Sequence, residues 1–205
     1  MTRDFSELVK APQQRRGHGF SVVYRVPGWR WGASSSEVFV KTQRDYTCRP
    51  AWRLWRRTPT LRRELRALNA CAAFGLPVPR VICYREDDGV AELVVEGIPD
   101  TLPLDEALAR PGANRQRIVA NVARTLALLH RHGWVHGALG NAHVLIQTLA
   151  DDRVALIDFE KARRRRALIG RDLDRFWRRT GCMSGDEKDQ FLRIYREAAQ
   201  HDRRG

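Results

Sequence analysis

The sequence HGALGNAHVLI at residues 136–146 and the sequence VALIDFEK at residues 154–161 decide the expected fold of this chain. The first is a polar, glycine-containing loop that leads into an apolar run, and the second is an apolar strand that ends in Asp158. A carboxylate just past such a strand commonly holds Mg²⁺ against a triphosphate, although Asp158 could instead cap the next turn. His136, taken alone, is more typical of a hydrogen-bonded structural histidine than of an acid or base. Together the two segments have the outline of a catalytic loop followed by a metal-binding aspartate.

Upstream of this loop, Lys41 ends the apolar strand segment at residues 38–40. The lysine is informative because only four of the 37 Lys plus Arg residues are lysine. A compact ammonium group suits a phosphate oxygen and an ion pair with a carboxylate, and Glu64 on the following helix is the expected partner. The plainer alternatives are a solvated lysine at a strand end and a helix-face glutamate that pairs with a neighbouring arginine.

Hydrophobic periodicity predicts a β-rich first half and a mainly helical second half. Strands are expected at residues 18–26, 36–41, 80–84 and 90–96, with a helix that has Thr58 as its N-cap, Pro59 in its first turn and Gly75 as its end. The second half is expected to contain helices at 105–110 and 114–132, a short strand entered from 135–146, a strand at 153–158, and two terminal helices, the last with Ser184 and Glu187 in capping-box spacing.

The length, hydrophobic content and net charge of the chain limit the class of protein to which it can belong. A chain of 205 residues with 43% hydrophobic residues can form one sizeable core, and no apolar run approaches the roughly 18 residues of a membrane span. The N-terminal residues lack a secretory signal pattern, so we expect a soluble, cytoplasmic chain with reduced cysteines. The net charge of +13 attracts phosphates, whether of nucleic acid, anionic lipid or nucleotides, and does not choose among them.

The order of strand lysine, helix glutamate, histidine loop and strand-exit aspartate is that of the protein-kinase-like fold. In detail the chain resembles the lipopolysaccharide kinase (Kdo/WaaP) family, particularly its InaA-like branch, over about residues 17–197. The resemblance is carried by residues 38–43, 57–64, 136–143, 156–163, 171–175 and 191–195. Its most specific elements are Glu160-Lys161 and the sequence DLDR at 172–175, whereas Gly17-His18-Gly19 is a weak glycine-rich loop.

The resemblance implies an α+β fold that is compact, two-lobed and protein-kinase-like, with a small β-rich N-lobe containing one helix and a mainly helical C-lobe. The expected division is an N-terminal extension at residues 1–16, an N-lobe at 17–97 and a C-lobe at 98–205. It also implies an ATP-dependent phosphotransferase that uses ATP and Mg²⁺. The acceptor would be a lipopolysaccharide core sugar or another phosphorylated glycolipid, with peripheral contact at the anionic cytoplasmic face of the inner membrane.

The resemblance also assigns roles to individual residues. Lys41 would contact the α- and β-phosphates, and Glu64 would hold Lys41. Asp158 would bind Mg²⁺, and His143 would stand where protein kinases place the second metal-binding residue. The hinge at residues 96–99 would hold adenine, which makes the backbone of Glu96, Gly97 and Ile98 the expected nucleotide contacts.

Ala138 is a departure from this pattern, because it aligns with the aspartate that accepts the proton of the substrate hydroxyl. Loss of a general base costs on the order of 10² to 10⁴ in rate, while positioning and metal electrostatics can survive. The first alternative is therefore a pseudokinase that binds nucleotide or a partner without efficient transfer.

A basic nucleic-acid-binding module is the second alternative. It is suggested by Arg163 to Arg166, but no recognition helix, zinc motif or aromatic RNA-binding motif accompanies the run, which argues against nucleic acid as a partner. The run lies where a kinase has its activation segment, and could meet acidic substrate, anionic lipid or only solvent. The Arg- and Trp-rich insertion at residues 42–57 is a second candidate surface for a phosphorylated glycolipid.

Overall fold

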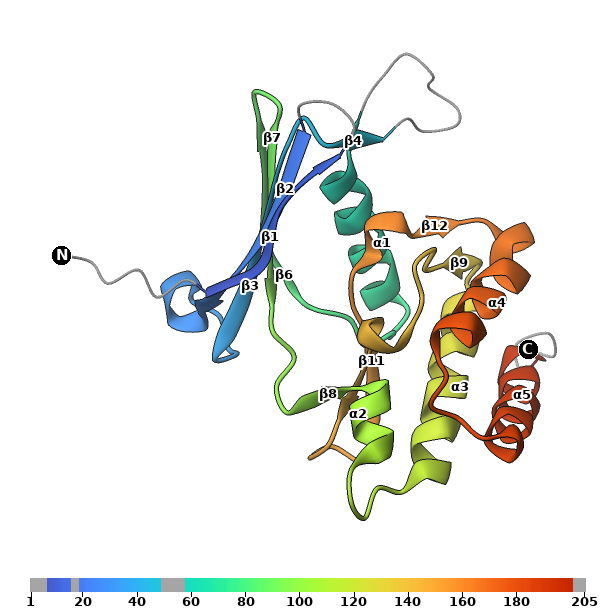
Figure 1. Cartoon of the computed structure of the whole chain (residues 1–205). Coiled ribbons are helices and arrows are strands. Elements are labelled where there is room, and N and C mark those ends of the chain that lie inside the picture. Colours follow the sequence, from blue (N-terminus) through green and yellow to red (C-terminus); the bar gives the residue numbers. More distant parts are fainter. Residues whose placement is uncertain (1–6, 16–18, 49–57, 201–205) are drawn as a thin grey trace. The chain divides into compact units, whose positions relative to one another are not determined.

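The computed structural model describes residues 7–15, 19–48 and 58–200, with the backbone alone for 10–15. The chain divides into two compact units, drawn together in Figure 1. The first unit comprises the chain up to Ala70 together with Pro79–Pro99, and the second comprises Cys71–Val78 and the chain from Asp100 onward. Gly17 and His18 of the glycine-rich loop, and most of the Arg- and Trp-rich insertion, including Trp52 and Trp55, lie outside the described residues.

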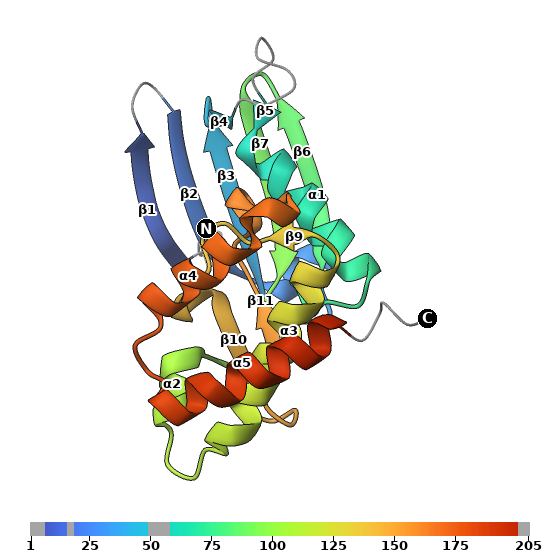
Figure 2. The same ribbon diagram turned by 90° about the vertical axis from the view of Figure 1, so that its right-hand side faces the viewer.

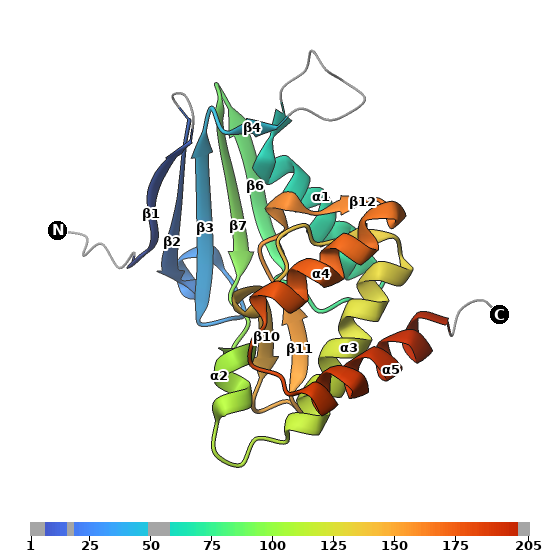
Figure 3. The ribbon, with the colours of Figure 1, turned by 45° about the vertical axis from the view of Figure 1, so that its right-hand side comes forward.

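The first unit is built on a five-stranded antiparallel sheet in the order β1-β2-β3-β7-β6 (Figure 3). The strands are β1 (Glu7–Arg15), β2 (Gly19–Pro27), β3 (Glu37–Arg44), β6 (Val81–Asp87) and β7 (Val90–Glu96), and the 3-10 helix η1 (Gly28–Trp31) joins β2 to β3. Strand β1 falls inside the range expected as an N-terminal extension and pairs with β2. The central strand β3 has a partner on both sides, so its backbone is fixed along its whole length.

Side chains of β3 alternate between two different environments, as the period of two requires. Val38 and Val40 lie in an apolar cluster with Val26 and Val94, packed by Tyr24, Trp31, Ala33, Ile82 and Cys83. On the other face Gln43 accepts a hydrogen bond from Thr60 at 2.6 Å and donates to Ser21 at 3.3 Å. Lys41 shares this polar face. It lies inside the strand rather than at the predicted end, because pairing with β2 and β7 continues to Arg44.

Helix α1 (Thr60–Ala73) begins later than the sequence predicted. Thr58 and Pro59 are not its cap and first turn. They form the short strand β5 (Thr58–Pro59), which pairs with β4 (Thr47–Cys48). Proline fits such an edge strand because its missing N–H is not needed there, and the N–H of Thr60 donates to the carbonyl of Tyr46 instead. The predicted end is confirmed, since Gly75 has a φ of +78° and its N–H donates to the carbonyl of Ala72.

The second unit is mainly helical. Its helices are α2 (Leu104–Ala109), α3 (Arg115–Arg131), α4 (Ile169–Arg179) and α5 (Gly185–Gln200), and α3 and α5 pack side by side (Figure 2). The predicted apolar face of α3 is confirmed, because Ile118, Val122, Leu126 and Leu129 are all fully buried. Asn114 caps this helix by accepting a hydrogen bond from the N–H of Arg117.

Short strands and 3-10 turns complete the second unit. They are β8 (Thr101–Pro103), β9 (Trp134–Val135), η2 (Asn141–His143), β10 (Val144–Gln147), β11 (Arg153–Leu156), η3 (Phe159–Lys161), β12 (Arg163–Arg164) and η4 (Arg166–Leu168). Strands β10 and β11 pair through a turn at Asp151 and Asp152, as predicted, and β8 pairs on the other side of β10. All four cysteines are free thiols. Within the described ranges, no helix combines the length and apolar character needed to cross a membrane.

An arginine fork ties three helices of this unit together. Arg115 donates to both carboxylate oxygens of Glu187 at 2.7 and 2.9 Å, and to the carbonyls of Leu108 and Cys182. Glu187 completes the predicted capping box, because it accepts from the N–H of Ser184 while its own N–H donates to the Ser184 hydroxyl. The hydrogen bonds from Arg115 hold the pKa of Glu187 below its ordinary value.

Replacing Glu187 with glutamine is expected to lower the free energy of unfolding by about 1 kcal/mol at neutral pH, since Arg115 is partly exposed and solvent screens the pair. Because the folded pKa is depressed, this contribution is complete above pH 4.5 and is lost as the pH falls through the folded pKa. Urea unfolding at pH 7 and pH 4 measures both effects. Glu197→Gln, which removes an exposed pair with Arg193 on the same helix, is the control and is expected to change little. Equal losses in the two variants would contradict the assignment.

Candidate active site

Lys41 and Glu64 form the predicted ion pair, with Nζ 2.6 Å from Oε1. The side chain of Glu64 is 2% exposed and that of Lys41 is 14% exposed, so both charges are largely removed from water. Strand β3 aims Lys41 at the second turn of α1, where the helix period places Glu64 next to Leu61 and Leu68 on the buried side. A buried glutamate that fixes a lysine ammonium holds a positive charge at a defined point on the sheet.

The hinge residue Glu96 is locked by neighbours in its own unit. Its carboxylate accepts hydrogen bonds from both the guanidinium of Arg80 and the N–H and hydroxyl of Ser34. The Arg80 hydrogen bonds lower the pKa of Glu96 to about 2. The backbone N–H of Glu96 donates to the carbonyl of Arg80, and the backbone N–H of Gly97 donates to the carbonyl of Glu37. Both backbone N–H groups are therefore already engaged in hydrogen bonds. Ile98 follows as a half-buried residue.

In the second unit, His136 is a structural histidine. It is completely buried, its Nε2 lies 2.8 Å from the carbonyl of Ile157, and its Nδ1 accepts from the N–H of Ala138 at 3.3 Å. Burial lowers the pKa of His136 to about 4. The ring is therefore neutral at pH 7, and both of its nitrogens are committed to backbone groups, one in the loop and one at Ile157.

A buried carboxylate supports the same loop. Asp172 on α4 accepts hydrogen bonds from the N–H groups of His136 at 2.7 Å and Gly137 at 2.8 Å. Burial raises the pKa of Asp172, but hydrogen bonds from His130 and these two amides outweigh burial and leave the pKa below its ordinary value. His130 lies between Asp172, 3.4 Å from its Nε2, and the hydroxyl of Tyr195, 2.7 Å from its Nδ1. Burial and the charge of Asp172 raise the pKa of Tyr195 to about 12, so its phenol stays a donor.

Asp158 lies beside His143, as the predicted metal site requires. Its Oδ2 is 3.3 Å from His143 Nε2, and the N–H of Ile157 donates to the His143 carbonyl. Asp158 has a φ of +64°, in the left-handed region that aspartate tolerates, and it makes no side-chain hydrogen bond that caps η3. The alternative that Asp158 only caps the next turn is therefore wrong.

Glu160 is a further candidate ligand that sequence reasoning missed. One of its carboxylate oxygens lies within 4.8 Å of one from Asp158. Carboxylate oxygens suit Mg²⁺, and an imidazole nitrogen also suits Mn²⁺ and other transition metals. Asp158 could thus share a divalent cation with His143 or with Glu160. In the sequence Glu160 is only a marker of the family resemblance, because its closeness to Asp158 depends on the left-handed turn at Asp158.

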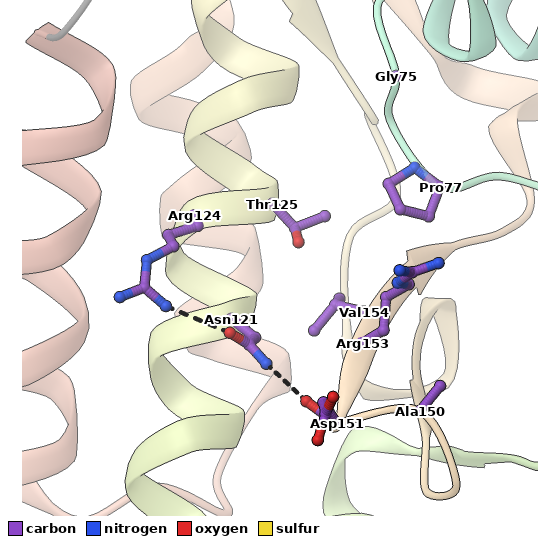
Figure 4. A pocket seen from close by; sticks show the side chains of 9 residues that line it. All are labelled: Gly75, Pro77, Asn121, Arg124, Thr125, Ala150, Asp151, Arg153 and Val154. Carbon is purple, nitrogen blue, oxygen red and sulfur yellow. Dashed lines mark hydrogen bonds between the residues drawn. The ribbon is translucent and has the colours of Figure 1, made fainter.

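A separate cavity of about 600 Å³ opens between α3 and the β10–β11 turn (Figure 4). Thr125, Pro77 and Val154 line it, and at its edge Arg124 donates to the side chain of Asn121. None of the predicted site residues lines this cavity, and it contains no paired acid and base. It is therefore not the candidate active site.

An ion-paired strand lysine, a buried loop histidine and a strand-exit aspartate beside a second histidine are typical of the protein-kinase-like class of fold. A crystal structure of aminoglycoside-3'-phosphotransferase of type VIII is similar, with a TM-score of 0.63 and 22% identity over 94% of this chain and 86% of that chain. The sequence matches the lipopolysaccharide kinase (Kdo/WaaP) family over residues 2–195, and the chain belongs to that family. A search of curated proteins found no match.

Proposed function

We propose that this chain is an ATP-dependent phosphotransferase of the InaA-like branch, and that it transfers the γ-phosphoryl group of MgATP to a lipopolysaccharide core sugar or another phosphorylated glycolipid. The observation that carries the proposal is the buried Lys41–Glu64 pair, with its 2.6 Å contact. An isolated ammonium would be costly to bury, and a carboxylate that compensates it keeps the charge available for phosphate oxygens. Similar lysine–glutamate pairs orient the α- and β-phosphates in kinases.

His143 and Asp158 would hold the metal, and Glu160, which lies near Asp158, is an additional candidate. The bound ion supplies charge neutralisation on the triphosphate. The chain itself fixes these ligands: the left-handed turn at Asp158 aims the carboxylate, and the hydrogen bond from Ile157 to the His143 carbonyl joins the two backbone segments. In the first unit, the Glu96–Arg80 ion pair keeps the hinge strand in place for adenine, which the backbone of residues 96–98 would contact.

We also propose that the chain works in the cytoplasm, and the +13 net charge supports peripheral contact with the inner membrane there, because anionic headgroups attract exposed arginines. Exposed Arg163 to Arg166 would face such a surface or a phosphorylated acceptor. Within the described residues this run forms part of β12 and η4 and shows no recognition helix for nucleic acid.

A nucleotide-binding pseudokinase is the second candidate, and Ala138 favours it. Its side chain is a methyl group with 6% exposure, which cannot accept a proton. ADP formation separates the two functions, because a pseudokinase binds MgATP without releasing ADP at a useful rate.

MgATP binding tests the nucleotide site directly. Wild-type protein is expected to gain thermal stability with MgATP, and Lys41→Met is expected to weaken binding by at least about 10-fold, the equivalent of one lost charged hydrogen bond. Because the single variant leaves Glu64 buried without its partner, Lys41→Met/Glu64→Gln is included, and binding is also measured by isothermal titration calorimetry. Lys188→Met, an exposed lysine on α5, is the matched control. Undiminished binding in both Lys41 variants contradicts the assigned site, and no binding in wild type contradicts both nucleotide-dependent functions.

A further inference from the structure

Arginine side chains contact the loop around Ala138, the residue that stands where a general base was expected. Arg175 donates to the carbonyl of Gly137 at 2.7 Å, and Arg179 donates to the carbonyl of Ala138 at 2.9 Å. The two arginines are four residues apart on α4, so they lie on the same face of that helix. Two guanidinium groups therefore contact consecutive carbonyls of the loop.

Arg179 packs closely against Gly140, where a larger residue would leave too little room for its side chain. A Cβ atom at Gly140 would lie 3.2 Å from both Cβ and Cδ of Arg179, tighter than ordinary contact. Each guanidinium has five N–H donors, and a single carbonyl uses only a small part of that capacity. Within the described part of the chain, neither Arg175 nor Arg179 pairs with a carboxylate, so both can still bind an anion.

The arginine run adds positive charge beside the same loop. Strand β12 pairs with β9, and Arg163 lies opposite Val135, the residue directly before His136. The N–H of Arg165 donates to the carbonyl of Gly133 at 2.8 Å, which fixes the backbone of the run. Residues 161–171 contain six Lys or Arg residues and no acidic residue, so the field here attracts anions.

Apart from His143, which the proposed function assigns to the metal, the loop offers no side chain to remove a proton from an acceptor. Residues 136–143 contain no acidic side chain. The ring nitrogens of His136 contact the carbonyl of Ile157 and the N–H of Ala138. Asp172 already accepts hydrogen bonds from the N–H groups of His136 and Gly137. A neutral hydroxyl needs such a base as it attacks phosphorus, whereas an ionised oxygen does not.

We propose that the acceptor presents its reacting oxygen already ionised, as a phosphate or carboxylate oxyanion, and that Arg175 and Arg179 position it. The inference rests on the proposed function. A lone pair of the oxyanion forms the new bond to the γ-phosphorus of ATP. The bond from that phosphorus to the β,γ-bridging oxygen breaks, and ADP leaves with the electron pair. No proton is transferred. A phosphate acceptor yields a phosphoric anhydride, and a carboxylate acceptor yields an acyl phosphate.

The test compares minimal acceptors of each chemistry. Wild-type protein is incubated with MgATP and either methyl phosphate, acetate, or the neutral hydroxyl acceptor methyl glucoside. Coupled ADP detection gives the rate, phosphorus NMR detects a phosphoric anhydride, and hydroxylamine traps an acyl phosphate. One oxyanion is expected to stimulate ADP formation at least about 10-fold over methyl glucoside, and the product identifies whether phosphate or carboxylate is the acceptor.

Variants then test whether Arg175 and Arg179 position the oxyanion acceptor or only stabilise the loop. Arg175→Gln and Arg179→Gln are each expected to raise the KM for the oxyanion about 10-fold and to leave the KM for ATP unchanged. Arg175→Lys keeps the charge and is expected to recover part of the loss. Arg178→Gln is the matched control, because Arg178 lies on the same helix and, among the residues that the structure describes, donates to the carbonyl of Asp174 and not to the loop. Ala138→Asp is expected to slow transfer to the oxyanion by like-charge repulsion, compared with the neutral isostere Ala138→Asn.

A binding measurement covers the case in which none of these small acceptors reacts. With a non-hydrolysable ATP analogue present, methyl phosphate or acetate is expected to raise the Tm of wild type and of Arg178→Gln but not of Arg175→Gln or Arg179→Gln. Equal shifts in all four proteins, or no shift in any, overturn the inference. Transfer to methyl glucoside alone, enhanced in Ala138→Asp, overturns the inference and leaves the proposed function standing. Failure of wild type to bind MgATP overturns the proposed function itself.

Discussion

Replacing Asp158 with asparagine is expected to lower ATP turnover by about 10²- to 10³-fold, the largest effect on activity among the substitutions considered. The carboxylate is proposed to hold the metal against the triphosphate, and metal electrostatics supply several kcal/mol of transition-state stabilisation in such reactions. Asparagine keeps the size of the side chain and also tolerates the left-handed backbone, with its φ of +64°, so the fold is expected to survive. ADP release at saturating Mg²⁺ measures the effect.

Asp151→Asn provides a matched control for this substitution. Asp151 is an exposed aspartate in the same unit with a φ of +52°, so the chemical change and the backbone conformation are equivalent. Turnover in Asp151→Asn is expected to equal that of wild type. If both variants lose activity alike, or if Asp158→Asn retains full metal-dependent turnover, the metal site is wrongly assigned.

Replacing Asp172 with alanine is expected to lower the free energy of unfolding by about 3 kcal/mol, the largest stability loss among the substitutions considered. The change leaves the buried N–H groups of His136 and Gly137 without their acceptor, and each unsatisfied buried donor costs about 1–3 kcal/mol. Asp172→Asn keeps one oxygen acceptor and is expected to lose about half as much. Urea unfolding followed by circular dichroism measures the loss.

The acid dependence of these variants provides a second measurement. Because the pKa of Asp172 is depressed in the folded protein, its contribution is present above the ordinary aspartate pKa and disappears as the pH falls through the folded value. The difference between wild type and Asp172→Ala should therefore narrow in acid. Asp174→Ala, an exposed aspartate two residues further along α4, is the control and should stay within about 0.5 kcal/mol of wild type. A loss in Asp174→Ala as large as in Asp172→Ala would contradict this account.

Local patterns in the sequence were sufficient to predict most elements and the Lys41–Glu64 pair. The apolar strand that contains Lys41 and the helix period that buries Glu64 are both short-range signals. The start of α1 was predicted wrongly because it depends on a contact between segments that lie apart in the sequence. Whether Pro59 lies in a first helical turn or in an edge strand depends on pairing with residues 47–48, about ten positions away.

The surroundings of the loop at 136–143 were the least predictable part of the candidate site. Arg175 and Arg179 reach the loop from a helix almost forty residues further along the chain, and in a chain rich in arginine no local feature distinguishes them from Arg178. The closeness of Glu160 to Asp158 likewise depends on the left-handed turn at Asp158, and the sequence does not predict that turn. Tertiary packing decides these contacts, and residue spacing alone does not.

The hydroxyl of Tyr195 has a practical consequence for protein engineering. Through His130 it connects the last described helix to the carboxylate that anchors the loop. Shortening the chain before Tyr195, a common way to improve crystallisation or expression, would remove this phenol and leave the imidazole of His130 without its donor in an apolar interior. A truncated protein that still folds would therefore be a poor reference for kinetic work, because the loop that is proposed to be catalytic would have lost the support that Tyr195 provides through His130 and Asp172.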